Sequence, residues 1–130
     1  MITRADLERI RVIRQRVESL LLRRDRLRES IMRMTPSRLS DMPHGNAFRD
    51  PMAEYIVRLE AIEEQYTRTL AELEEWLAMV DEALSRMRPD YQMLLRLRYV
   101  DGLSWRRIAR KMHFSEDWVK HLHGDALRNL

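Results

Sequence analysis

The chain has 130 residues, no cysteine and a formal net charge of +3. The lack of cysteine excludes disulfides and thiolate metal sites and favours a reducing compartment, so we expect a cytoplasmic protein. No apolar run is long enough to cross a membrane, and the scarcity of glycine and proline beside many arginine, glutamate and leucine residues indicates an all-α protein.

The first predicted element is a long helix over residues 4–34. Its apolar residues recur with alternating steps of three and four, the spacing of a coiled-coil seam: Ile10, Ile13, Val17, Leu20, Leu27, Ile31 and Met34. Arg24 interrupts this seam. Residues 35–50 combine proline and glycine with serine and aspartate, and we predict that they form a loop.

A second long helix is predicted to begin at Asp50-Pro51, with the aspartate as its cap, and to end near Arg88. It has a seam of the same kind, which Glu63 interrupts: Ile56, Leu59, Tyr66, Leu70, Leu73, Leu77, Val80, Leu84 and Met87. Residues 1–34 carry ten arginines against five acids, and residues 51–88 carry four against nine, so the two helices should attract one another. Residues 1–88 are therefore predicted to form a long antiparallel, coiled-coil-like hairpin.

The two charged residues in the seams suggest how the hairpin is aligned. If the chain folds back about the loop, Arg24 and Glu63 come to about the same level. A buried charge without a partner is costly, and pairing offsets that cost, so we predict that the two meet and fix the register. The alternative is that both lie at the edge of the seam with their charged groups in water.

Residues 89–130 are predicted to form a second domain, a helix-turn-helix lobe. Pro89 suits the first position of a helix, and Asp101-Gly102 ends that helix. Ser104 is placed to cap a helix of about eight residues, His113-Phe114 makes a turn, and Ser115 caps a last helix over residues 116–129. This spacing matches a motif that presents one helix to the DNA major groove. A helical pair that merely packs against the N-terminal part is the alternative.

Candidate DNA-binding residues lie on both helices of the motif. Its first helix carries four cations whose natural role is phosphate contact, with a merely solvated helix face as the alternative: Arg106, Arg107, Arg110 and Lys111. Lys120 and His121, one turn into the last helix, are the predicted major-groove readers. Glu116 and Asp117 either accept from cytosine amino groups or only stabilise the helix N-terminus.

Nothing in the chain indicates an enzyme. We find no Ser/His/Asp arrangement and no glycine-rich phosphate loop. His121 and His123 are two residues apart on a helix, so they point to different sides and make a poor metal pair. We therefore expect no catalytic activity, no metal and no cofactor.

The segment 95–105 (LRLRYVDGLSW), with Ile108, Ala109 and Ser115 after it, resembles region four of the bacterial primary sigma factors, which reads the promoter −35 element. In layout the whole chain is similar to small phage and prophage proteins, including the RinA and ArpU types of late-gene transcription regulator. The resemblance implies a phage-encoded regulator that binds double-stranded DNA in a bacterial host cell, with RNA polymerase as a further candidate partner.

The alternative function is a helical interaction module, such as a packaging adaptor that uses its helix-turn-helix-like lobe for protein contacts. Acidic residues at positions 116, 117 and 125 of the last helix favour this alternative. Under either function we expect a homo-oligomer, because Trp76 and several leucines beside the seams leave apolar surface after one helix pairing.

Overall fold

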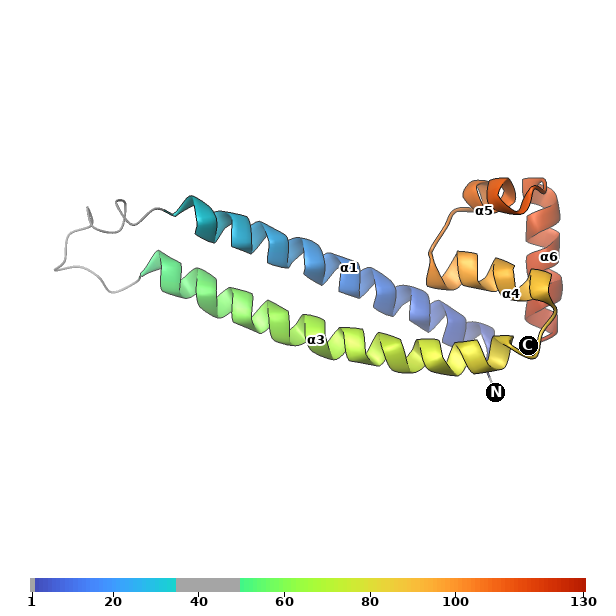
Figure 1. Cartoon of the computed structure of the whole chain (residues 1–130), viewed down its shortest axis with the longest axis horizontal. Helices are drawn as coiled ribbons and strands as arrows, with labels where there is room; N and C mark the ends of the chain where they lie inside the picture. Colours follow the sequence, from blue (N-terminus) through green and yellow to red (C-terminus); the bar gives the residue numbers. More distant parts are fainter. Residues whose placement is uncertain (1, 35–49) are drawn as a thin grey trace. The chain divides into compact units, whose positions relative to one another are not determined.

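The computed structural model describes residues 2–34 and 50–130, and every regular element among them is a helix (Figure 1). The elements are α1 (Arg4–Arg33), α3 (Pro51–Leu84), α4 (Pro89–Leu95), η2 (Arg96–Val100), α5 (Trp105–Met112) and α6 (Glu116–Arg128). The predicted all-α fold, a long helix pair followed by a lobe of short helices, is confirmed. The predicted loop lies outside the described residues except for Asp50. No helix among the described residues has the length and apolar character to span a bilayer.

The chain divides into two compact units, Met1–Gln15 with Ala71–Leu130, and Arg16–Leu70. This division crosses both long helices, whereas the sequence suggested a boundary between residues 88 and 89. The start of α1 belongs to the first unit because Leu7 and Ile10 there are fully buried. Arg4 and Glu8 also lie close enough to residues of the short helices to influence their charges.

In the unit Arg16–Leu70, α1 and α3 run antiparallel, and the predicted Arg24–Glu63 ion pair is wrong. The carboxylate of Glu63 instead accepts a hydrogen bond from Arg28, with 2.9 Å between Nη2 and Oε1. Arg28 lies one helical turn beyond Arg24, so a different arginine from the expected one reaches Glu63. The guanidinium of Arg24 lies over the ring of Tyr66 at 5.2 Å and within 3.6 Å of the Asp25 carboxylate, which together stabilise this half-buried charge.

Helix α3 begins where the sequence predicts and ends earlier. The Asp50 carboxylate accepts a hydrogen bond of 3.0 Å from the Met52 backbone N–H, which confirms Asp50 as the cap. The helix ends at Leu84 and not at Arg88. Pro89 disfavours helical backbone angles only at the residue before it, and Arg88 has φ −58° and ψ 145°. Residues 85–87 form a turn and a bend after the helix end.

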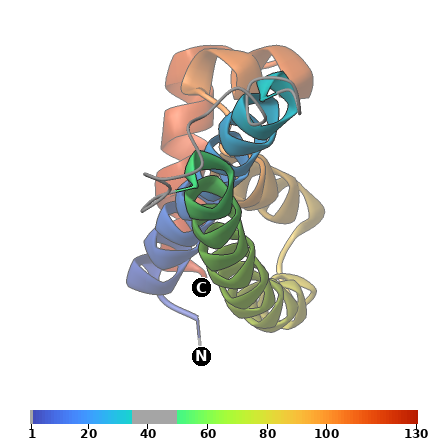
Figure 2. The same cartoon turned by 90° about the vertical axis from the view of Figure 1, so that its left-hand side faces the viewer.

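The first unit has its core beneath α4 and η2. All five apolar residues predicted to face a core there are buried: Tyr91, Leu94, Leu95, Leu97 and Tyr99. The sequence predicted one continuous helix, but residues Arg96–Val100 adopt the wider π-helical form, and the Asp101 N–H donates to the Arg96 carbonyl five residues back at 2.9 Å. Figures 1 and 2 show α6 crossing α4 and α5 steeply, so that the short helices enclose this core.

Two glycines of this unit should respond in opposite ways to alanine. Gly102 has a φ of +69°, and a Cβ there would also collide with the Arg14 guanidinium. Gly124 is helical, and a Cβ there would meet only Arg128, at 3.7 Å. We predict that Gly102→Ala lowers the free energy of unfolding by about 1–2 kcal/mol, because left-handed angles are strained for alanine. Gly124→Ala should raise it by up to about 1 kcal/mol through better helix propensity.

Chemical denaturation of both variants beside the wild type measures these changes. A neutral Gly102→Ala or a destabilising Gly124→Ala contradicts the local geometry described for that position.

Candidate nucleic-acid interface

The geometry of the turn between α5 and α6 is set by two serine caps and one left-handed residue. The Ser104 hydroxyl accepts a hydrogen bond from the Arg107 N–H at 3.3 Å, and the Ser115 hydroxyl accepts one from the Trp118 N–H at 3.1 Å. Both predicted caps are confirmed. His113 ends α5 with φ 60° and ψ 39°, a conformation that histidine adopts more readily than most residues. Three residues therefore form the turn between an eight-residue helix and a thirteen-residue helix.

Helix α6 packs on the core through one stripe of side chains. Val119, Leu122 and Ala126 are buried, and Leu127, which shares their helical spacing, is half-buried. The stripe also contains His123, which is only 9% exposed and which the sequence reasoning missed. The signal was present, because His123 follows Val119 by four residues and precedes Ala126 by three, the spacing of a shared helix face.

A buried polar contact ties this histidine to the π-helical turn. The Tyr99 hydroxyl and His123 Nε2 are 2.7 Å apart. The edge of the Trp105 ring meets the His123 ring at 4.8 Å, and the Arg98 guanidinium lies over the Trp105 ring at 4.1 Å. Arg98 also donates to the Leu103 carbonyl at 3.1 Å. This network connects η2, α5 and α6, and it fixes which side of α6 faces the core.

The two partners of this contact keep complementary protonation states. Burial, and then the positive charges of Arg4 and Arg98, lower the pKa of His123 from 6.5 to about 4. Burial, and then the negative charge of Glu8, raise the pKa of Tyr99 above its usual value of 10. At neutral pH the imidazole is therefore uncharged and the phenol keeps its proton, so the phenol can donate to an unprotonated Nε2.

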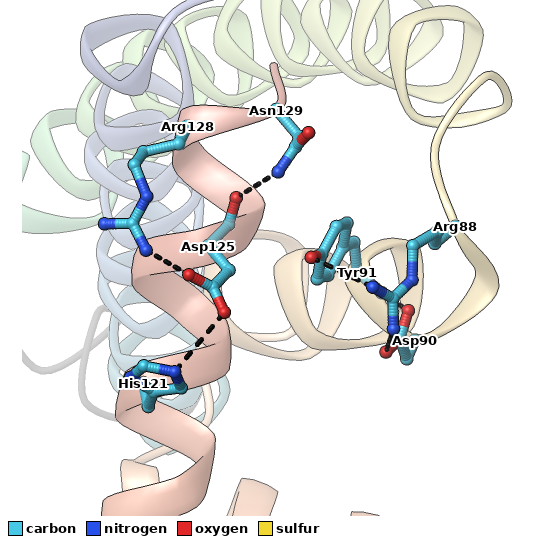
Figure 3. Close-up of polar contacts among 7 residues, drawn as sticks. All are labelled: Arg88, Asp90, Tyr91, His121, Asp125, Arg128 and Asn129. Carbon is cyan, nitrogen blue, oxygen red and sulfur yellow. Dashed lines mark hydrogen bonds and ion pairs between the residues drawn. The ribbon is translucent and has the colours of Figure 1, made fainter.

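All eight predicted DNA-binding residues are solvent-exposed: Arg106, Arg107, Arg110 and Lys111 on α5, and Glu116, Asp117, Lys120 and His121 on α6. His121 Nε2 lies 3.5 Å from the Asp125 carboxylate, which also accepts a hydrogen bond from Arg128 (Figure 3). Figure 3 shows these three side chains along one side of α6, with Asp125 between the other two. Asp125 therefore helps to hold the His121 ring in place on this face.

A row of rings on the same side of the motif was not predicted. Phe114 is 43% exposed and Trp118 is 49% exposed. The Phe114 and Trp118 rings meet edge to face at 6.3 Å, and the Trp118 and His121 rings lie 5.6 Å apart at 33°. We call Phe114, Trp118 and His121 the aromatic ridge. Sequence reasoning missed it because Trp118 lies outside the apolar stripe and was assigned no role.

Within residues 2–34 and 50–130, no group of three or more His, Cys, Asp or Glu side chains is arranged to hold a metal ion. The exposed residues of the motif offer charges, hydrogen-bonding groups and rings, which are means of recognising a macromolecule.

These features define α5 and α6 as a helix-turn-helix, in which the first helix is strongly basic and the second has a mixed, ring-bearing face. Residues 77–130 match the family model described as sigma-70, region 4. The C-terminal part of the chain is thus a sigma region-four-like helix-turn-helix, as its sequence predicted. The match begins inside α3, near Ala71, where the first compact unit resumes after residue 15. No curated protein and no solved structure matches the chain.

The buried histidine predicts an acid-dependent loss of stability. Its folded pKa of about 4 lies below the ordinary 6.5, so the unfolded state takes up a proton first as the pH falls. The contribution of neutral His123 to the free energy of unfolding is fully present above about pH 6.5. It is lost as the pH falls toward 4, and the free energy of unfolding decreases by at most about 3 kcal/mol. Denaturation between pH 7 and 4 should show this loss in the wild type, and a smaller one in His123→Gln.

An NMR titration of the His123 ring provides the direct measurement, with a midpoint near 4 expected. A midpoint near 6.5, or equal pH dependence in the wild type and His123→Gln, rules out the buried neutral imidazole.

Proposed function

We propose that this protein is a sequence-specific DNA-binding regulator of transcription that reads the major groove with α6. The observation that carries the proposal is a sigma region-four-like motif on which all eight candidate residues are exposed. Within its compact unit, one side of α6 packs on the core. The other side of the helix is exposed and can meet a partner.

The two helices have different proposed roles. The cations of α5 contact phosphates, which positions the motif on the duplex and supplies affinity that does not depend on sequence. Lys120 and His121 contact base edges. Glu116 and Asp117 repel phosphate, and a carboxylate can accept from a cytosine amino group, so these two acids favour particular bases over non-specific binding.

The remaining parts of the proposal rest on the family resemblance. We place the protein in the cytoplasm of a bacterial host, encoded by a phage, with RNA polymerase as a further partner and with no enzymatic role. We also propose that it works as a homo-oligomer, because a two-fold assembly lets two recognition helices bind successive half-sites.

The second candidate function is a protein-interaction or packaging adaptor. It is favoured by the acidic end of α6 and by the exposed Phe114 and Trp118, since exposed apolar groups often mark protein interfaces. The two functions differ in a simple respect, because an adaptor of this kind need not bind duplex DNA.

Selection of bound sequences from random duplexes, followed by binding titrations over a range of salt, tests the proposal. Lys120→Ala with His121→Ala should reduce the preference for the selected site over random duplex about tenfold or more. Arg106→Ala with Arg107→Ala should weaken binding to all duplexes alike. This pair should also reduce the slope of log affinity against log salt by about 0.9 per lost phosphate contact.

Arg68→Ala is the matched control, because it removes one exposed arginine that lies in the other unit. It should leave both affinity and preference close to those of the wild type. If no duplex, selected or random, binds at low salt, the DNA-binding proposal is overturned and the adaptor is favoured.

A further inference from the structure

The indole of Trp118 is exposed on a helix whose other large apolar residues are buried or half-buried. Trp118 is the third residue of α6, so it lies in the first helical turn, the end that meets base edges in helix-turn-helix proteins. Half of its surface is open to water. Leaving a large apolar ring in water forgoes favourable burial, which a partner with an apolar surface would restore.

We propose that Trp118 contacts the C5-methyl groups of thymine in the major groove and makes thymine part of the recognised sequence. This inference rests on the proposed function. It adds a specificity-determining residue that carries no charge and makes its contact through apolar atoms.

The ring is held in place before any partner arrives. The Phe114 ring meets it edge to face at 6.3 Å, and the His121 ring lies against it at 5.6 Å. His121 Nε2 in turn lies 3.5 Å from the Asp125 carboxylate. Because neighbours restrict the ring, little conformational freedom is lost on binding, which favours a specific contact.

The charges around the aromatic ridge favour a contact with base edges over a contact with phosphates. Glu116 and Asp117 lie in the same turn of α6 as Trp118 and repel phosphate groups. The cations that attract phosphate lie on α5. A ring beside two carboxylates therefore faces base edges, and the thymine methyl is the apolar group that base edges present in the major groove.

A basic protein partner is the competing occupant, since the two carboxylates would attract it. The four cations of α5 in the same unit count against this choice, because they would repel such a partner. Together α5 and α6 offer cations for phosphates and an apolar ring for base edges, the two kinds of group that a duplex presents along its major groove.

Replacement of thymine by deoxyuridine tests the contact, because it removes only the methyl group. We use the duplex obtained by selection with the wild-type protein and replace its thymines one at a time. At one or two positions the wild type should bind about fourfold more weakly, the value for one buried methyl-sized group. Trp118→Ala should bind the thymine duplex more weakly and should not respond to deoxyuridine at those positions.

Met93→Ala is the matched control, because Met93 is a 45%-exposed apolar residue of α4 in the same unit. It should keep both the wild-type affinity and the sensitivity to deoxyuridine. The position of Trp118 on the surface means that its truncation should leave the fold intact, which thermal unfolding checks. Trp118→Phe should keep part of the methyl sensitivity, since an apolar ring remains.

The outcomes separate this inference from the function on which it rests. If the wild type binds a selected duplex but ignores every deoxyuridine, or if Trp118→Ala responds as the wild type does, the thymine contact is overturned and DNA binding stands. If the selected site contains no thymine, the thymine contact is likewise overturned and DNA binding stands. If no duplex binds at all, both proposals are overturned.

Discussion

The hydrogen bond between the Tyr99 hydroxyl and His123 Nε2 determines how α6 is presented. It is buried, and it joins the π-helical turn to the middle of α6 at 2.7 Å. A buried polar group left without a partner costs about 1–3 kcal/mol, so turning α6 about its axis would lose this bond as well as the packing of Val119 and Leu122. The rotation of α6 is therefore fixed from inside, and the face that remains outside follows from it.

The protonation states of this pair are part of the same constraint. A charged imidazole in this position would be desolvated and would face the positive charges of Arg4 and Arg98. Neutral His123 avoids both penalties at physiological pH and leaves Nε2 free to accept. The start of α1 thus takes part in the electrostatics of the recognition motif, although 91 positions separate Glu8 from Tyr99 and 119 separate Arg4 from His123. This is consistent with the compact unit that contains both segments.

Local signals in the sequence were sufficient for much of this unit. The caps at Ser104 and Ser115 and the helix end at Gly102, with its positive φ, are confirmed, because each depends on residues only a few positions apart. The apolar spacing likewise identifies the buried residues of α4 and η2, and all but the half-buried Leu127 on α6. The eight candidate interface residues are exposed for the same reason, since helical spacing alone separates them from the stripes.

Features that depend on distant contacts were not predictable in the same way. The register of α1 against α3 depends on which arginine reaches Glu63, and four residues separate Arg28 from the expected Arg24. The burial of His123 required Tyr99 opposite it, twenty-four positions earlier in the chain. The π-helical turn likewise had no signal in the apolar spacing. The aromatic ridge did have a local signal, because Phe114 and His121 lie only four and three positions from Trp118.

A chemical nuclease attached to α6 tests most directly whether this helix enters the major groove. The chain has no cysteine, so Lys120→Cys provides one attachment point for an iron chelate that cleaves nearby DNA. On a selected duplex the account predicts localised cleavage of both strands within the site, in the staggered pattern of a probe in the major groove. The same chelate on Arg68→Cys should give no localised cleavage within the site. Cleavage localised from position 68 but absent from position 120, with the duplex still bound, would contradict the account.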